Sequence, residues 1–370
     1  MKINKKITLL ISSLQGGGAE GVCVNLANSL SNLGWIVDLV VLNLNKQVHY
    51  DKLSPKINLI ILNKNHARFS IFALLKYIVI HKTKKFLVFN YELSVILLIF
   101  IFFLRLNFKV YSRNINIISI KINLMKKKNI FSKYITYNQL NFFYKKSDYV
   151  INQCHDMQDD LLKVYPQLSN RCSIIFNPIP LHIENFIKTN DLNNFKKKNY
   201  ILCIGRLEKQ KAFHFAIEAF AGITDKFPDL RLKILGDGSL LNELKKTAEN
   251  YYVTNKVDFE GFKENLISYY LHARATVLTS LYEGYPNVLI ESISLNTPVI
   301  AFNSLGGQRE IIQDGVNGYL VKNLDVQDMK KKLFKLLNNK GMNRNLIASL
   351  KKNNIKLISK NYEKIFTLYE

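Results

Sequence analysis

Cysteine is scarce in this chain, and its spacing excludes several kinds of protein. The 370 residues contain four cysteines (Cys23, Cys154, Cys172 and Cys203), and no two of them form a Cys-x-x-Cys pair. This spacing argues against a zinc ribbon and against a disulfide framework. We expect reduced, mostly buried thiols, as in a protein of the cytoplasm. The run 154–156, Cys-His-Asp, lacks partners at ligand spacing and is interpreted as a strand-to-helix loop.

Long apolar runs are also missing. The longest, Leu93 to Leu104, is only about a dozen residues, whereas a membrane-spanning helix needs about 20. We expect a core or interfacial helix there, and the basic residues around it favour contact with an anionic membrane surface. The apolar residues 7–11 lead into glycines without an Ala-x-Ala-like cleavage site. They are therefore interpreted as a buried first strand and not as a signal peptide.

Acidic residues are few relative to basic ones. The sequence has 28 Asp and Glu residues but 52 Lys and Arg residues, which gives a net charge of +24. Such an excess favours anionic partners: nucleic acid, phosphorylated substrates or an anionic membrane. A solvated basic exterior with no partner is the alternative, so charge alone does not decide. The 48% hydrophobic content is that of an ordinary globular protein, and no repeat of solenoid length or low-complexity tract is present.

Apolar strand-like runs alternate with amphipathic runs along the whole chain, which predicts an α/β protein with two doubly wound, Rossmann-like domains facing across a cleft. We expect an N-terminal domain over 1–180, completed by a C-terminal helix over 355–370. A polar, lysine-rich linker is expected over 181–199 and a second domain over 200–354. Longer helices are expected over 130–146 and 342–359.

One stretch, residues 280–291, combines two carboxylates with a helix start. An apolar run over 275–279 predicts a strand, and Pro286 precedes a predicted helix, so Glu283 falls in the loop and Glu291 about one turn into the helix. Ligands of open α/β sheets bind at the carboxyl ends of strands, and a helix N-terminus attracts phosphate. Carboxylates suit neutral hydroxyls better than phosphate. A ligand that combines phosphate with many hydroxyls is a sugar nucleotide, so the stretch predicts a site for one.

Two further segments supply the complementary groups. Arg206 and Lys211 follow a predicted strand over 200–205, and two cations at the same edge suit a diphosphate and the negative charge of a departing nucleotide. Gly16, Gly17 and Gly18 follow the first strand and would let the backbone approach a ligand closely. A plain tight turn or a solvated basic loop is the structural alternative for each.

Taken together, these segments resemble the retaining, GT-B-fold glycosyltransferases of family 4, and within that family they resemble bacterial enzymes that extend lipid-linked oligosaccharides. The resemblance covers nearly the whole chain in the expected order and is most specific in the Glu-x7-Glu segment. The segments that carry it are Gly16-Gly17-Gly18-Ala19-Glu20, Gly205-Arg206-Leu207 with Gln210-Lys211, Glu283-Gly284-Tyr285-Pro286-Asn287 with Glu291, Gly306-Gly307 with Glu310-Ile311-Ile312, and Asn317-Gly318-Tyr319-Leu320.

The resemblance implies a role for each matched residue. Arg206 and Lys211 would hold the donor diphosphate, and Glu283 would accept hydrogen bonds from the transferred sugar. The other implied donor-binding groups are Gly16, Gly17 and Gly18, Phe262 in the turn near the nucleobase, the backbone near Asn287 and Val288, and Glu291 at the ribose.

The chain departs from its relatives at two places. Ala212 stands where many relatives have glycine, and Arg113 or Asn114 stands where several relatives place a histidine near the sugar. An acceptor-side role would then fall on Arg113 or Asn114, with His155 and His182 less well placed.

The resemblance implies a hexosyltransferase that uses a nucleotide sugar, with UDP-sugar favoured, to extend a lipid-linked or growing glycan in lipopolysaccharide or other surface polysaccharide biosynthesis. It implies no cofactor and no metal ion, and a location peripheral to the inner face of the cytoplasmic membrane. Two alternatives are kept. A nicotinamide-dependent oxidoreductase would share the βα pattern but requires a Gly-x-Gly-x-x-Gly fingerprint. A basic nucleic-acid-binding protein would show a reader module or a basic stripe. The chain has neither, so no nucleic acid is expected as a partner.

Overall fold

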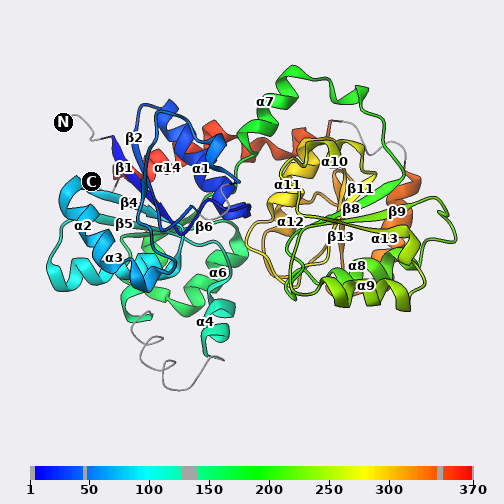
Figure 1. Cartoon of the computed structure of the whole chain (residues 1–370), viewed down its shortest axis with the longest axis horizontal. Helices are drawn as coiled ribbons and strands as arrows, with labels where there is room; N and C mark the ends of the chain where they lie inside the picture. Colours follow the sequence, from blue (N-terminus) through cyan, green and yellow to red (C-terminus); the bar gives the residue numbers. More distant parts are fainter. Residues whose placement is uncertain (1–4, 45–47, 127–140, 340–344, 369–370) are drawn as a thin grey trace. The chain divides into compact units, whose positions relative to one another are not determined.

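The computed structural model describes residues 5–44, 48–126, 141–339 and 345–368, and the chain divides into two compact units (Figure 1). Unit 1 comprises Met1–Pro180 and Lys352–Glu370, and unit 2 comprises Leu181–Lys351. The segment 181–199, which we expected to be a linker, begins with a helix, α7 (Leu181–Thr189), and is grouped with unit 2.

In its described part, unit 1 is built on a seven-stranded sheet in which every neighbouring pair is parallel, in the order β3-β2-β1-β4-β5-β6-β7. The chain first winds outward from β1 and then returns to start again beside it at β4. The strands are β1 (Lys6–Ile11), β2 (Ile36–Val41), β3 (Asn58–Ile61), β4 (Lys85–Val88), β5 (Lys109–Arg113), β6 (Tyr149–Asn152) and β7 (Cys172–Ile174).

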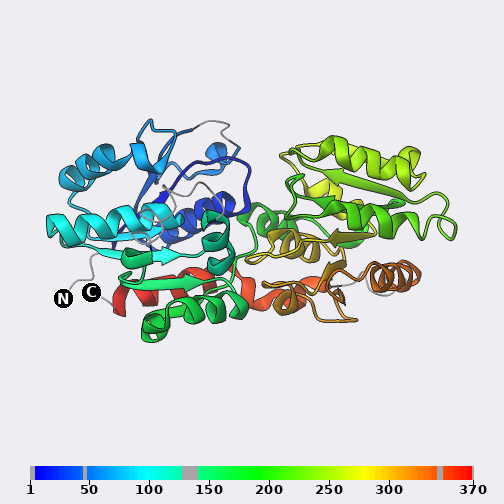
Figure 2. The ribbon, with the colours of Figure 1, turned by 90° about the horizontal axis from the view of Figure 1, so that it is seen from below.

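Helices cover both faces of this sheet because its central strands are apolar on both sides. One core packs α1 and α14 on one face, and the other packs α2, α3, α4 and α6 on the opposite face. Figure 2 shows α14, in red, and α3, in cyan, on opposite sides of the sheet. The helices are α1 (Gly18–Asn32), α2 (Ile71–His81), α3 (Tyr91–Leu104), α4 (Ile118–Lys126), α6 (His155–Val164) and α14 (Ile355–Leu368), with 3-10 turns η1 (Tyr50–Lys52), η2 (Ala67–Phe69) and η3 (Pro166–Arg171).

Unit 2 repeats the same winding on a six-stranded parallel sheet in the order β10-β9-β8-β11-β12-β13. Its main core lies between the sheet and α8, α9 and α13, while α10, α11 and α12 cover the other face. The strands are β8 (Tyr200–Ile204), β9 (Arg231–Leu235), β10 (Val257–Gly261), β11 (Ala275–Leu278), β12 (Val299–Phe302) and β13 (Gly318–Val321). The remaining helices are α8 (Phe213–Ala221), α9 (Leu241–Asn250), α10 (Ile267–His272), α11 (Asn287–Ser294), α12 (Gln308–Ile311) and α13 (Val326–Asn338), with η4 (Leu192–Asn194), η5 (Thr254–Lys256) and η6 (Leu346–Asn353).

These two units confirm the prediction of two doubly wound α/β domains, but two expected helices need comment. The helix predicted over 130–146 falls mostly outside the described residues. The one predicted over 342–359 is wrong as a single element, because η6 ends at Asn353 and α14 begins at Ile355. Asn354 starts the new helix, since its Oδ1 accepts from the amides of Lys356 (3.1 Å) and Leu357 (3.2 Å).

The apolar helix α3 is mainly a core element. Leu93, Val95, Leu97, Leu98 and Phe100 are buried in the core shared with α2, and only the last residues of the helix are exposed. Within the described ranges, no helix is both long enough and apolar enough to cross a bilayer.

Candidate functional site

The order of the strands in unit 2 brings two loops together at the carboxyl edge of its sheet. β8 and β11 are neighbours, yet the chain leaves β8 towards β9 and leaves β11 towards β12, on opposite sides. Ligands of open α/β sheets bind at the carboxyl ends of the strands beside such a switch point. Three hydrogen bonds join the two loops: Leu281 N to Gln210 O (2.9 Å), Gln210 Nε2 to Tyr282 O (3.0 Å) and Thr279 Oγ1 to Lys211 O (2.9 Å).

An ion pair stands at this switch point. Lys211 Nζ lies 2.5 Å from Glu283 Oε1, and only 14% and 10% of the two side chains are exposed. Shielding from water strengthens the attraction but also makes either charge costly without its partner. Arg206, on the same loop as Lys211, is exposed. The structure thus brings together the three residues, Arg206, Lys211 and Glu283, that the sequence predicted to act at one edge.

Two glycines make this close approach possible. Gly205 has a φ of +155°, and a Cβ on it would lie 2.9 Å from Lys211 Cε. Gly306 has a φ of +135°, and a Cβ there would lie 2.4 Å from the main-chain oxygen of Glu283. Since that neighbour is backbone, which cannot move aside cheaply, Gly306 is required for the position of the Glu283 loop.

Ala212, which stands where many relatives have glycine, adopts a backbone conformation that favours glycine. Its φ of +46° and ψ of 44° place it in the left-handed region, where alanine is disfavoured and glycine is not. Ala212 is the N-cap residue of α8, so the helix begins at Phe213 and Lys211 stays in the preceding loop.

The second glutamate is held by a tyrosine that the sequence did not indicate. α11 begins after Pro286, and Glu291 lies in its second turn, where its Oε2 accepts from Tyr270 Oη at 2.9 Å. Tyr270 is completely buried, and burial, together with the neighbouring charge of Glu291, raises the pKa of the Tyr270 hydroxyl. It remains a hydrogen-bond donor at neutral pH and fixes the Glu291 carboxylate. Tyr270 lies in α10, a short helix without a sequence motif.

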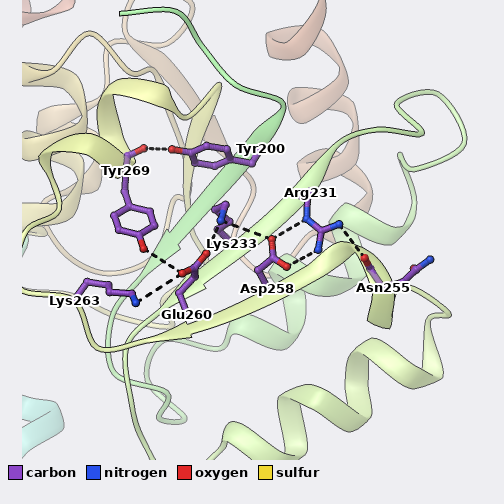
Figure 3. A network of polar contacts seen from close by, with 8 residues as sticks. All are labelled: Tyr200, Arg231, Lys233, Asn255, Asp258, Glu260, Lys263 and Tyr269. Atoms are coloured by element: carbon purple, nitrogen blue, oxygen red, sulfur yellow. Dashed lines mark hydrogen bonds and ion pairs between the residues drawn. The ribbon is translucent and has the colours of Figure 1, made fainter.

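The turn that carries Phe262 is fixed by a network of polar side chains on β9, β10 and α10 (Figure 3). Glu260 accepts from Lys233 and from Tyr269 Oη at 3.1 Å, and Lys263 Nζ lies 3.9 Å away. The bond from Lys233 is the main cause that lowers the pKa of Glu260. With Glu260 held in this way, Phe262 stands half-exposed at the carboxyl end of β10.

Further contacts make the Arg206 loop rigid. Glu208 accepts from the amide of Ser239 at 3.0 Å and from its hydroxyl at 2.9 Å, and these bonds lower the pKa of Glu208. Leu207 N donates to Asp237 O at 2.9 Å. The loops that follow β8 and β9 are therefore joined to each other.

In unit 1, the glycine loop Gly16–Gly18 precedes α1, and Gly17 is its N-cap residue. His49 packs over this turn, with its Cε1 3.4 Å from where a Cβ on Gly21 would lie. Burial, aided by the charge of Lys52, lowers the pKa of His49 to about 4. The imidazole is therefore neutral at pH 7. His49 could not be predicted from the sequence, because it follows no motif and only the fold brings it to the loop.

Arg113 and Asn114 lie at the end of β5 and are 3% and 4% exposed. Arg113 donates from Nε to Tyr362 Oη (2.8 Å) and from Nη2 to Asn177 Oδ1 (2.5 Å). Its guanidinium lies 5.1 Å from the ring centroid of Phe89. Asn114 donates to Asn152 Oδ1 at 2.7 Å. The structure thus gives both residues partners inside unit 1, and the acceptor-side role stays a prediction.

No metal-binding cluster was found where the structure describes the chain: no three His, Cys, Asp or Glu side chains gather in a way that could hold an ion. The expectation that the protein needs no metal stays a prediction.

The sheet orders of the two units and the site at the switch point of unit 2 define a protein of the GT-B fold, as predicted. The structure superposes on a solved Anabaena protein in complex with UDP and glucose with a TM-score of 0.76, covering 98% of this chain and 99% of that one at 16% sequence identity.

Residues 185–353 match the family described as Glycosyl transferases group 1, so the chain carries a domain of that family, nearly all of it in unit 2. The resemblance stated from the sequence is confirmed to this extent.

Two relatives illustrate the range of the similarity. An uncharacterized glycosyltransferase of Methanocaldococcus jannaschii is 33% identical over 196 residues, covering 52% of this chain and 48% of that protein. An α-1,4-N-acetyl-D-galactosaminyltransferase of Campylobacter jejuni, whose name gives a diphospho-undecaprenol-linked saccharide as its substrate, is 28% identical over 353 residues, covering 94% and 92%. The chain spans about half the length of two of the curated relatives that it matches.

Proposed function

We propose that the protein transfers a sugar from a nucleotide-sugar donor, a UDP-sugar, to a lipid-linked or growing glycan. The observation that carries this proposal is the Lys211–Glu283 pair at the switch point of unit 2, beside Arg206 and the start of α11. Cations and a helix N-terminus suit a diphosphate, and shielded carboxylates suit sugar hydroxyls.

Each residue then has a role in the transfer. Lys211 and Arg206 neutralise the diphosphate as the bond between the anomeric carbon and the phosphate oxygen breaks, so they stabilise the charge that develops on the leaving group. Glu283 accepts from hydroxyls of the transferred sugar, and Glu291, fixed by Tyr270, accepts from the ribose. Phe262 stacks against the nucleobase. The Gly16–Gly18 loop, Asn287 and Val288 contribute backbone groups.

The reaction is proposed to retain the anomeric configuration. The acceptor oxygen then forms its bond on the face from which the nucleotide leaves, and the proton of the acceptor hydroxyl passes to a diphosphate oxygen of the leaving group. Bond breaking runs ahead of bond formation, so the positive charge on the sugar ring and the negative charge on the diphosphate both peak in the transition state, and the cations act on the latter.

The relatives support the classes of donor and acceptor. The Anabaena structure contains UDP and glucose, and the Campylobacter protein is named for a lipid-linked acceptor. We propose the same classes here, with the acceptor presented at the inner face of the cytoplasmic membrane during the assembly of a surface polysaccharide. The net charge of +24 is compatible with both anionic partners.

A panel of UDP-, GDP- and ADP-sugars tests this proposal by thermal shift, followed by transfer to a synthetic polyprenyl-diphosphate-linked saccharide. We expect stabilisation by UDP-sugars and a product with the donor's anomeric configuration by NMR. Stabilisation by NAD instead of any sugar nucleotide, or an inverted product, would contradict it.

A further inference from the structure

We propose that a basic aromatic patch at the amino edge of the unit 1 sheet docks the protein on an anionic phospholipid bilayer. The patch consists of Phe102, Phe103 and Leu104 at the end of α3, with Phe142, Lys145 and Lys146 in the segment before β6. The patch supplies the surface for the membrane contact in the proposed function. Binding to the bilayer does not depend on that function, and only the biological role of the binding rests on it.

Topology brings these two segments together. α3 follows β4 and runs back to the amino edge of the sheet, where β5 begins, and residues 142–146 lead into the amino end of the neighbouring strand β6. Ring contacts join them: the ring centroids of Phe102 and Phe142 lie 6.3 Å apart, and those of Phe103 and Phe143 lie 6.0 Å apart. The patch is therefore one surface.

Its apolar groups are exposed to an unusual degree for aromatic side chains. Phe103 is 66% exposed, Phe102 49% and Leu104 48%. The preceding part of α3 is buried, so the exposed part is confined to the last turn of the helix. A short apolar tip of this kind can enter the interfacial region of a bilayer but is too small to span it.

The charges around the exposed last turn of α3 favour an anionic bilayer as the binding partner. Lys146 Nζ lies 4.6 Å from the ring centroid of Phe102 and 4.8 Å from that of Phe142, and Lys145 Nζ lies 5.2 Å from the latter. Arg105 is exposed directly after the tip. The nearby carboxylate of Asp148 already pairs with Lys109 at 3.1 Å. Aromatic rings flanked by cations suit anionic headgroups above an apolar layer.

The end of α2 enlarges the same edge. Val79 and Ile80 are 60% and 61% exposed, and Lys82 and Lys84 follow them. Lys84 Nζ donates to Asn107 O at 3.3 Å, which places the ends of α2 and α3 side by side. A second copy of the chain is a poorer occupant, because it would bring two cationic surfaces face to face.

The placement of the patch decides which substitutions can test membrane contact. Leu97 and Phe100 belong to the same apolar run, but both are buried. Substituting them would disturb the core and would say nothing about a bilayer. The patch also lies at the amino edge, whereas the Gly16–Gly18 loop follows the carboxyl end of β1, so docking leaves that loop uncovered.

The test is co-sedimentation of the full chain, without donor, with vesicles of phosphatidylcholine containing 30% phosphatidylglycerol or none. Lys145→Gln/Lys146→Gln should weaken partition onto the anionic vesicles at least about ten-fold. The matched control Lys245→Gln/Lys246→Gln, on exposed positions of α9, removes the same charge and should weaken it less than about three-fold. Phe103→Ser should weaken it about five-fold, and Tyr252→Ser, at a more exposed aromatic residue of unit 2, should not.

Equal losses in the two lysine pairs would show that net charge alone drives binding, and wild-type partition of the patch variants would show that another surface binds; either result overturns the proposal. A third result would also overturn the proposal: in sedimentation velocity the wild type is a dimer and the patch variants are monomers, while vesicle binding is unchanged. The patch would then bind a second copy of the chain and not a bilayer. Far-UV circular dichroism and the thermal shift by UDP confirm that each variant is folded. Because neither vesicles nor transfer enter the UDP measurement, failure of docking is distinct from failure of the proposed donor site.

Discussion

Unit 1 and unit 2 wind their sheets in the same order, yet different side chains stand where the order reverses. In unit 2 the loops beside the reversal carry the shielded Lys211–Glu283 pair and the exposed Arg206. In unit 1 the loops after β1 and β4 meet through neutral groups, with the Ser12 amide donating to Asn90 Oδ1 at 3.0 Å. The same topology thus places an ion pair at the reversal in unit 2 and a contact between neutral groups at the reversal in unit 1.

The cations of the two units are used differently. Arg113 in unit 1 is buried and holds Tyr362 and Asn177, so it ties α14 to the sheet. Lys211 in unit 2 is paired with the Glu283 carboxylate instead, and 14% of its side chain is exposed. A cation can stabilise a fold or bind an anionic ligand, and its burial and partners distinguish the two uses. The predictions below separate them.

The largest effect is expected at the Lys211–Glu283 pair of unit 2. Lys211→Ala should lower the rate of sugar transfer about 10²–10³-fold, because a positive charge no longer faces the departing diphosphate. Transfer is measured with labelled donor and saturating acceptor. Lys209→Ala is the matched control, since Lys209 is an exposed lysine two residues earlier in the loop. Comparable loss in both variants would mean that the site is elsewhere.

The next effect is expected in unit 1. Arg113→Met should lower the free energy of unfolding by about 2–4 kcal/mol, because Tyr362 and Asn177 lose a buried donor. Trp35, the only tryptophan of the chain, packs against Phe366 of α14 and reports this unfolding by fluorescence. A variant that is as stable as the wild type but loses transfer to the acceptor would instead support the acceptor-side role that the sequence suggested.

His49, beside the glycine loop of unit 1, should make the free energy of unfolding depend on pH. His49 has a pKa of about 4 in the folded chain and an ordinary value of 6.5, so between these values the unfolded chain binds more protons. The His49 contribution is present above pH 6.5 and is lost as the pH falls towards 4, with an upper size of about 1–3 kcal/mol. The difference in unfolding free energy between the wild type and His49→Gln, followed by Trp35 fluorescence from pH 7.5 to 4, checks this. A flat difference would show that the imidazole is not shielded.

The smallest effect is expected at Tyr270. Tyr270→Phe removes the bond to Glu291 and should weaken donor binding about five-fold, the equivalent of about 1 kcal/mol. Calorimetric titration with UDP-glucose measures it, and Tyr269→Phe, at the neighbouring tyrosine that bonds Glu260, is the comparison. Wild-type affinity in Tyr270→Phe would mean that Glu291 needs no support.

Much of this arrangement could be predicted because it follows from local patterns. Apolar runs and glycine turns indicated the strands, and the Glu-x7-Glu spacing indicated the loop and helix that carry Glu283 and Glu291. Contacts between distant segments could not be predicted in the same way. Tyr270 reaches Glu291 only because α10 and α11 pack together, and His49 reaches Gly21 only through the path of the chain after β2. The burial of Arg113 could not be predicted either, because a short motif carries no sign of burial.

The proposed donor site assigns the diphosphate to Lys211 and the transferred sugar to Glu283. The most direct test is the affinity for UDP, which lacks the sugar, measured by calorimetry for Lys211→Ala and Glu283→Gln. We predict that Lys211→Ala weakens UDP binding at least about ten-fold, whereas Glu283→Gln leaves it unchanged or tightens it, because a negative charge near the diphosphate is removed. Equal weakening in both variants would show that the pair only supports the fold, and would contradict the assignment of the diphosphate to Lys211 and the sugar to Glu283.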